Sequence, residues 1–178
     1  LKTRQKINID CSSGTIGNVY EGQLNFEVKR HELKKLKNPK VKISINIGSP
    51  DEAFKYHNLP VKGVGLGRLE FIIASQIQIH PNALIDYERI KKGELKFNNQ
   101  TKKDLEKLIK KIDQLTIGYK NKEDFYVDKL TFGIAKIAAA FWPNEVIIRF
   151  SDFKTNEYAS LAGGNLYEPF EENPMIGW

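Results

Sequence analysis

The segment GVGLGRLEF at residues 63–71 decides the fold, because it predicts a β-strand between two other strand-like segments. VKISINIG at residues 41–48 and EVIIRF at residues 145–150 are rich in β-branched and apolar residues, which favour extended structure. Ser49 and Pro50 follow the first of these strands and match the cap and first position of a helix.

Helical patterns fill the long interval between the second and third strands. An apolar stretch runs from residue 71 to residue 79, His80-Pro81 breaks it, and a helix is expected over residues 82–92. Another helix begins near Thr101, and a final one ends before Pro143. The apolar positions of that final helix are Leu130, Ile134, Ile137, Ala138 and Phe141.

Strand, helix, strand, helices and strand in this order predict a parallel α/β sheet or barrel with right-handed crossovers. The pattern itself leaves an open parallel sheet and an eight-stranded barrel as alternatives. Three strands do not close an eight-stranded barrel, so the sequence is expected to be part of a longer polypeptide.

The first thirty residues differ in pattern from the rest. Polar and apolar residues alternate on both sides of a Ser- and Gly-rich turn, which predicts a hairpin over residues 1–30. Residues 31–40 are rich in lysine and are interpreted as a linker. The barrel part is assigned to residues 41–178.

Composition excludes several classes of protein. The chain has 178 residues, of which 40% are hydrophobic, enough for a core. It contains no apolar run of about 18 residues and begins without a secretory signal pattern. The single Cys11 excludes an internal disulfide and fits a reducing compartment, so the cytoplasm is expected.

The formal net charge of +6 does not by itself indicate nucleic acid. Lysines of residues 101–115 are interleaved with acids on the polar side of an amphipathic helix, which is the pattern of a solvated face. No aromatic-rich basic strand accompanies them. Neither a nucleic acid nor a membrane partner is predicted. The apolar stripe of this helix consists of Leu105, Leu108, Ile109, Ile112 and Leu115.

Two arginines close predicted strands and are the candidate functional residues. Arg68 closes a short apolar stretch in the second strand, and Arg149 closes one in the third. A guanidinium keeps its charge and presents a planar fork of donors, so two of them at neighbouring strand ends form a pocket for carboxylate or phosphate oxygens. The alternative is that each arginine is neutralised by a nearby acid such as Glu70 or Asp152.

A dinucleotide site is not supported by the glycines. Gly63, Gly65 and Gly67 alternate, but Arg68 occupies the position where the fingerprint needs a further small residue. The end of a strand follows, where the fingerprint requires the start of a helix.

Residues 41–178 resemble the phosphoenolpyruvate-utilising barrel of the phosphoenolpyruvate synthase family, the pyruvate, water dikinases. ISINIGSPDEAF, LPVKGVGLGRLEFIIASQIQIHP, KLTFGIAKIAAAFWPNEVIIRFSDFKTNEYASLAGG and YEPFEENPMIGW match the family pattern in order and spacing. The Ser-Asp-Phe-Lys stretch after Arg149 is discriminating, because pyruvate, phosphate dikinases carry Pro-Pro-Leu-His there. Residues 1–30 resemble the final strands of the swivelling phosphohistidine domain.

The resemblance implies that the fold class is a partial (β/α)8 barrel of the TIM type, comprising its first three strands with a helical insertion. It also implies a phosphotransferase that converts ATP, pyruvate and water to AMP, phosphoenolpyruvate and phosphate through a phosphohistidine. Arg68 and Arg149 match the positions that hold phosphate and enolate oxygens. Pyruvate or phosphoenolpyruvate would bind here with Mg²⁺ whose ligands are expected outside this segment, ATP would bind to another domain, and the full-length protein is expected to be a homo-oligomer.

Weaker candidates surround the arginines. Asn46 lies late in the first strand, and Asp152 and Lys154 follow Arg149, so each is a possible substrate-binding residue. Glu172 and Asn173 lie in the loop that presents the family's next arginine.

The three histidines do not lie in the family's phosphohistidine motif, so the carrier histidine is expected before residue 1 and the isolated chain is expected to be inactive. Two alternatives stay open. One is a sister enzyme with the same barrel, either a pyruvate, phosphate dikinase or an enzyme I of sugar transport. The other is a non-catalytic interaction module that uses the basic linker and residues 82–124.

Overall fold

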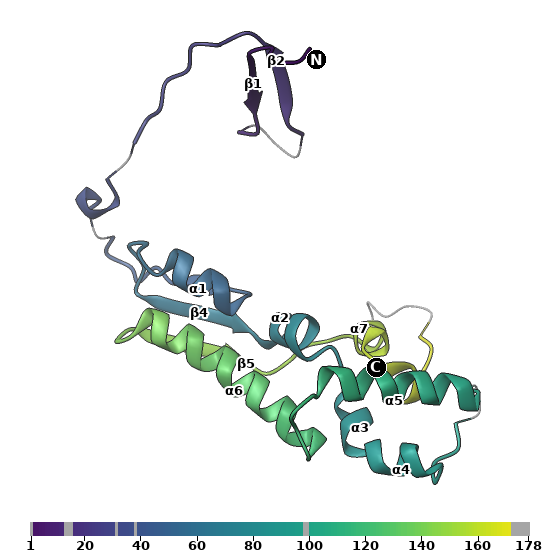
Figure 1. Ribbon diagram of the computed structural model, residues 1–178. Helices are drawn as coiled ribbons and strands as arrows, with labels where there is room; N and C mark the ends of the chain where they lie inside the picture. The colour runs from purple at the N-terminus through teal and green to yellow at the C-terminus, as the bar shows by residue number, and fades with distance from the viewer. Residues whose placement is uncertain (1, 13–15, 31, 38, 98–99, 172–178) are drawn as a thin grey trace. The chain divides into compact units, whose positions relative to one another are not determined.

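The computed structural model describes residues 2–12, 16–30, 32–37, 39–97 and 100–171, and divides the chain into two compact units, residues 1–36 and 37–178 (Figure 1). In the first unit, β1 (Ile7–Asp10) pairs with β2 (Asn18–Glu21) in antiparallel orientation, which confirms the predicted hairpin. A short 3-10 helix, η1 (Leu33–Lys35), lies within the predicted linker.

The second unit contains a parallel three-stranded sheet in the order β3-β4-β5, which confirms the predicted parallel α/β class (Figure 1). The strands are β3 (Ile45–Ile47), β4 (Gly63–Arg68) and β5 (Glu145–Arg149). The first predicted strand was too long, because residues 41–44 lie outside β3. The second was also too long, since α2 (Leu69–Ile72) begins directly after Arg68.

Helices occupy the intervals that the periodicity indicated. Ser49 accepts a hydrogen bond from the Asp51 N–H at the start of the first helix, and Thr101 forms a capping box with Asp104, as their positions predicted. His80 caps another helix by accepting from the Asn82 N–H at 3.2 Å. The helices of this unit are α1 (Pro50–Tyr56), α2, the π-helical turn η2 (Ile73–Ile77), α3 (Pro81–Ile85), α4 (Tyr87–Lys92), α5 (Lys102–Leu115), α6 (Lys122–Phe141), α7 (Thr155–Ser160) and the 3-10 helix η3 (Gly164–Leu166).

One helix prediction was wrong, and one short helix was not predicted. The helix expected over residues 82–92 is divided into α3 and α4, because the backbone at Asp86 leaves the helical region between them. Residues after Arg149 showed no clear periodicity, yet they form α7, whose six residues are too few for a periodic pattern to emerge.

The core lies where α1 and α6 pack against each other and against the sheet. Ile137 and Phe141 of α6 are buried as expected, but Ala138 is exposed. The buried stripe follows Gly133, Ile137 and Phe141 at intervals of four residues, so Ala138 lies one position away from it. Gly133 allows α6 to pack closely against Ile72, since a Cβ at this position would lie 2.8 Å from Ile72 Cδ1.

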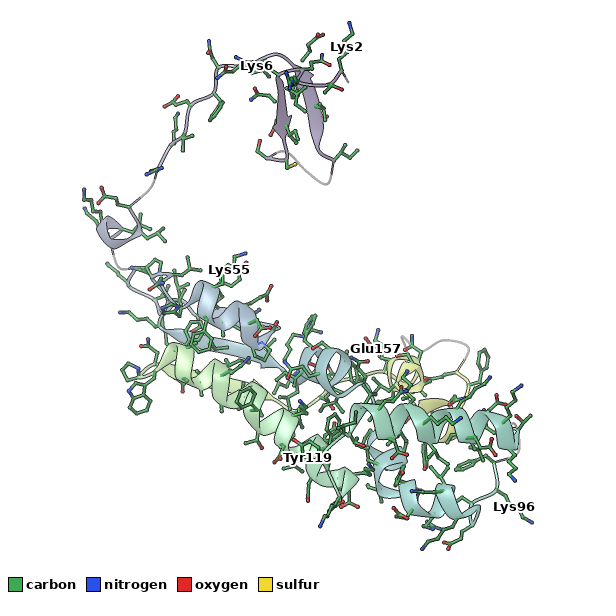
Figure 2. All side chains as sticks on the ribbon, in the orientation of Figure 1. Lys2, Lys6, Lys55, Lys96, Tyr119 and Glu157 are labelled. Carbon is green, nitrogen blue, oxygen red and sulfur yellow. The ribbon has the colours of Figure 1, made fainter. Side chains whose placement is uncertain are left out.

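The apolar stripe predicted for α5 is the side of this helix that packs against the core. Ile112 is buried, Leu108, Ile109 and Leu115 are partly buried, and the lysines of α5 are exposed. Tyr119, labelled in Figure 2, contacts the Phe125 ring edge to face with centroids 5.4 Å apart and so connects the end of α5 to α6. Of the helices in the described residues, none has the length and apolar character needed to cross a membrane.

Gly63 generates the first testable prediction, because it has a φ of +124° and a Cβ there would lie 2.1 Å from the Glu145 carbonyl oxygen. Gly63→Ala should therefore lower the free energy of unfolding by about 3 kcal/mol or more, combining strain with a clash between β4 and β5. The matched control is Gly93→Ala, which has a φ of +72° but open space around it and should lose about 1 kcal/mol. Urea unfolding measures both, and equal losses would contradict the prediction.

Candidate functional site

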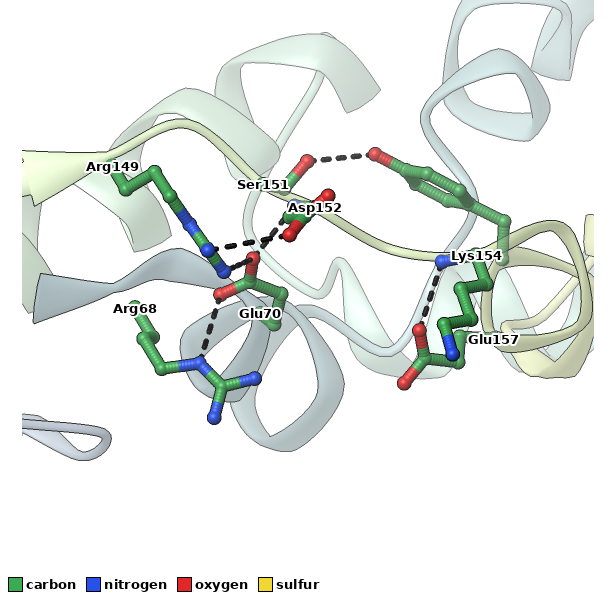
Figure 3. A network of polar contacts seen from close by, with 8 residues as sticks. Arg68, Glu70, Arg149, Ser151, Asp152, Lys154 and Glu157 are labelled. Atoms are coloured by element: carbon green, nitrogen blue, oxygen red, sulfur yellow. Dashed lines mark hydrogen bonds and ion pairs between the residues drawn. The ribbon is translucent and has the colours of Figure 1, made fainter. Parts of the chain in front are cut away.

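Arg68 and Arg149 lie side by side at the carboxyl ends of β4 and β5. They are register partners in the parallel pair, so their side chains leave the sheet on the same face. Ile148, next to Arg149, packs into the core, and successive strand residues point to opposite faces. The two guanidinium groups therefore lie on the face opposite the core, and Figure 3 shows them on either side of the Glu70 carboxylate.

Arg149 is held by two acids. Its Nη2 donates to Glu70 Oε1 at 2.9 Å, and its Nη1 lies 3.2 Å from Asp152 Oδ2. Its Nε is buried and has no hydrogen-bond partner among the described residues. The Arg149 side chain keeps 41% of its surface exposed, so it stays accessible from solvent despite these contacts.

Glu70 is a buried carboxylate between the two arginines. Its side chain is 7% exposed, and Oε1 also accepts from the Asp152 backbone N–H at 2.6 Å. Oε2 lies 3.8 Å from Arg68 Nε. Burial raises the pKa of the Glu70 carboxyl, but hydrogen bonds from its own backbone, Asp152 and Arg149 outweigh burial and bring the pKa below its usual value. Glu70 is therefore charged at neutral pH.

Arg68 has looser contacts than Arg149. Its guanidinium carbon lies 4.9 Å from the centroid of the Phe71 ring, a cation–π contact, and its side chain is 45% exposed. The 3.8 Å separation from Glu70 is an ion pair but too long for a hydrogen bond. Arg68 thus has free donors that face solvent.

The arginines line a pocket of about 600 Å³ at the carboxyl ends of the strands. Four of the predicted site residues, Arg68, Arg149, Asn46 and Asp152, are brought together there. Lys154 is not among the lining residues; its backbone N–H donates to Glu157 Oε2 at 2.8 Å at the start of α7. The lining residues are Asn46, Ile47, Gly48, Ser49, Glu52, Leu66, Arg68, Phe71, Arg149 and Asp152.

Asp152 lines the pocket and also contacts Arg149. Its carboxylate lies against the Arg149 guanidinium, so it neutralises part of that charge and cannot itself attract an anion. The alternative, in which nearby acids neutralise the arginines at the strand ends, thus holds in part, because Glu70 and Asp152 both contact Arg149. Glu172 and Asn173 lie outside the described residues.

Sequence reasoning did not assign Glu70, Phe71, Ser49 or Glu52 to the site. Glu70 and Phe71 follow Arg68 directly, and an acid two residues after a strand-end arginine was a signal for the shared ion pair. Ser49 was interpreted only as a helix cap, and it both caps α1 and lines the pocket.

The described residues of the pocket do not fit Mg²⁺. Its acids are Glu52, Asp152 and the adjacent Glu70, but the last two are each paired with the Arg149 guanidinium. Across the described part of the chain, no three His, Cys, Asp or Glu side chains gather as metal ligands would.

A family model described as "PEP-utilising enzyme, PEP-binding domain", where PEP is phosphoenolpyruvate, matches residues 24–178. Relatives named phosphoenolpyruvate synthase match the whole chain. The protein from Aquifex aeolicus is 45% identical over 210 residues, and the chain covers 24% of it. Those from Synechocystis sp. and Escherichia coli are 47% and 41% identical, with 20% and 21% covered.

The chain thus spans about a fifth to a quarter of the length of the curated relatives that it matches. The family model covers both arginines, Glu70 and the other residues of the pocket. Its PEP-binding description agrees with a pocket in which two guanidinium groups meet at strand ends. The chain belongs to the family of phosphoenolpyruvate-utilising enzymes, as a member of their phosphoenolpyruvate-binding domain.

Proposed function

We propose that the chain forms the phosphoenolpyruvate- and pyruvate-binding part of a phosphoenolpyruvate synthase, an enzyme that converts ATP, pyruvate and water to AMP, phosphoenolpyruvate and phosphate. The observation that carries the proposal is the register pairing of Arg68 with Arg149 beside one pocket. The relatives named phosphoenolpyruvate synthase support this enzyme over its sister dikinase and sugar-transport enzyme.

The pocket suits an anion with several oxygens. Phosphoenolpyruvate carries a carboxylate and a phosphate, and a guanidinium presents a planar fork of donors to either group. Arg68 and Arg149 provide two such forks at adjacent strand ends, and the Asn46 amide adds a neutral polar group in the same pocket. We assign Arg68 and Arg149 to the phosphate and enolate oxygens, and Asn46 to a supporting contact.

The proposed reaction is a phosphoryl transfer from a phosphohistidine of another domain. A base of the intact enzyme takes a methyl proton from pyruvate to give its enolate, and the enolate oxygen forms a bond to phosphorus. The N–P bond breaks with its electron pair left on nitrogen, and because the other ring nitrogen carries a proton, the histidine leaves as a neutral imidazole. Negative charge gathers on the enolate and on the moving phosphoryl group, so cations placed in advance lower the barrier. Arg68 and Arg149 perform this task in our proposal.

The remaining assignments belong to the same proposal. The parallel sheet would be the first three strands of a (β/α)8 barrel, whose active sites lie at the carboxyl ends of the strands. Residues 1–30 would be the end of the phosphohistidine domain, and residues 31–40 a linker. Mg²⁺ would be held by residues other than those described, ATP would bind to another domain, and the enzyme would be a cytoplasmic homo-oligomer.

Asp152 and Lys154 take supporting roles in the proposal. Asp152 orients Arg149 through its carboxylate and fixes Glu70 through its backbone N–H. Lys154 lies at the start of α7, where its backbone donates to Glu157. We propose that its ammonium group adds positive charge near the pocket without contacting the reacting atoms.

Arg149→Ala in the intact protein should lower pyruvate-dependent formation of phosphoenolpyruvate by about a hundredfold or more, because an organised charge at the transferred group is removed. Arg149→Lys should restore little of this activity, since a point charge does not reproduce a planar two-pronged contact. Phosphoenolpyruvate formation from ATP and pyruvate is the measurement.

Arg89→Ala is the matched control, because Arg89 is also ion-paired three residues away, with Asp86, but lies on α4 outside the pocket. It should keep the activity of the unsubstituted protein. Activity of Arg149→Ala within threefold of that level, at equal folded fraction, would count against the proposal and favour a non-catalytic interaction module.

Arg68→Ala should weaken phosphoenolpyruvate binding by about tenfold or more, because it removes a charged hydrogen-bonding group from the pocket. Phosphorylation of the carrier histidine by ATP should persist, since that half-reaction belongs to another domain in the proposal. Calorimetry measures the binding, and trapping of phosphohistidine from labelled ATP measures the half-reaction. Loss of both would show that Arg68 supports the fold or a different step.

A further inference from the structure

We propose that Glu70 is a positioning residue that gives the two arginines unequal freedom, so that Arg149 is fixed and Arg68 adjusts to the bound anion. The identity of that anion, phosphoenolpyruvate, rests on the proposed function. The arrangement of the arginines is a property of the chain itself and can be measured without any ligand.

The two oxygens of Glu70 have different partners. Oε1 accepts from Arg149 Nη2 at 2.9 Å and from the Asp152 N–H at 2.6 Å, so it fixes both the side chain and the backbone after β5. Oε2 has no hydrogen-bond partner among the described residues, and Arg68 Nε lies 3.8 Å away from it. Hydrogen bonds are directional at 2.7–3.2 Å, whereas an ion pair at the longer separation tolerates displacement.

The surroundings of the guanidinium groups reinforce this difference. Arg149 has a second acid, Asp152, at 3.2 Å. The Arg68 guanidinium carbon lies over the Phe71 ring, 4.9 Å from its centroid. This cation–π attraction keeps the guanidinium close to the ring but lets it shift parallel to the ring plane. Glu70 cannot follow a moving partner, since its side chain is 7% exposed and it lies in the first turn of α2 directly after Arg68. Arg68 therefore moves relative to a fixed carboxylate.

If Glu70 has this positioning role, neutralising it should weaken anion binding, which is the opposite of what its charge alone predicts. Glu70 adds a negative charge beside a pocket for anions, so neutralising it should tighten anion binding if only its charge mattered. In Glu70→Gln, the amide oxygen can replace Oε1, and the amide NH₂ then stands where Oε2 faces the Arg68 Nε–H. Two donors oppose each other there, so Arg68 leaves its position and anion binding weakens.

The experiment compares Glu70→Gln with Glu52→Gln in the intact protein. Glu52 lines the same pocket and is not an ion-pair partner of either arginine in the described residues, so its substitution removes the same charge without disturbing them. Calorimetry should show phosphoenolpyruvate bound about tenfold more weakly by Glu70→Gln and more tightly by Glu52→Gln, because the latter only removes a negative charge from the pocket. Equal or tighter binding by Glu70→Gln would overturn the positioning role.

Phenylglyoxal labelling without ligand, followed peptide by peptide by mass spectrometry, measures each arginine separately. Glu70→Gln should raise the labelling rate of Arg68 about fivefold and that of Arg149 less than twofold, because Oε1 is replaced and Oε2 is not. Equal changes at both arginines, or none, would overturn the inference. Failure of the unsubstituted protein to bind phosphoenolpyruvate would instead overturn the proposed function and leave the labelling result intact.

Glu70→Asp provides a second variant, with thermal unfolding as the check on folding for both. Aspartate keeps the charge but is one methylene shorter, so it cannot reach both arginines and the Asp152 N–H from the same backbone position. It should bind phosphoenolpyruvate as weakly as Glu70→Gln. Full binding by Glu70→Asp would show that charge, and not position, is what Glu70 contributes.

Discussion

A buried carboxylate shared by two strand-end arginines is the interaction on which the site depends. Glu70 loses its hydration on folding, and a buried charge left without a partner costs on the order of a few kcal/mol. Its partners come from three places: Arg68 in β4, Arg149 in β5 and the Asp152 backbone after β5. A register of β4 and β5 other than the observed one would separate Glu70 from Arg149 and from the Asp152 N–H, so these contacts and the strand pairing support each other.

The approach of β4 to β5 is made possible by the glycines of β4. A Cβ at Gly67 would lie 2.5 Å from Ile148 Cδ1, and one at Gly63 would overlap the Glu145 carbonyl. Ile148 of β5 therefore packs directly over the β4 backbone. Arg68 and Arg149, at the ends of the two strands, remain register partners. The glycines that suggested a dinucleotide loop serve sheet packing instead.

The switch from strand to helix after Arg68 explains why the site is asymmetric. Arg68 is the last residue of β4, and α2 begins at the next residue. Glu70 and Phe71 therefore lie in the first turn of a helix that starts directly at the end of the strand. Glu70 and Phe71 both contact the arginine that precedes them in sequence. Arg149 has no such helix directly behind it; its partners are Glu70, distant in sequence, and Asp152 in the following loop. Arg68 is thus held by residues close to it in sequence, whereas Arg149 depends on a tertiary contact with Glu70.

The sequence by itself determined the parallel α/β class, the helix caps at Ser49 and Thr101, and the position of Arg68 and Arg149 at neighbouring strand ends, because these depend on local pattern. Only the tertiary structure decided where β4 gives way to α2, the contact of Asp152 with the Arg149 guanidinium, and the place of Glu70 between the two arginines. The physical reason is that burial and pairing of a carboxylate depend on residues about eighty positions away, and no local pattern encodes the register that brings them together.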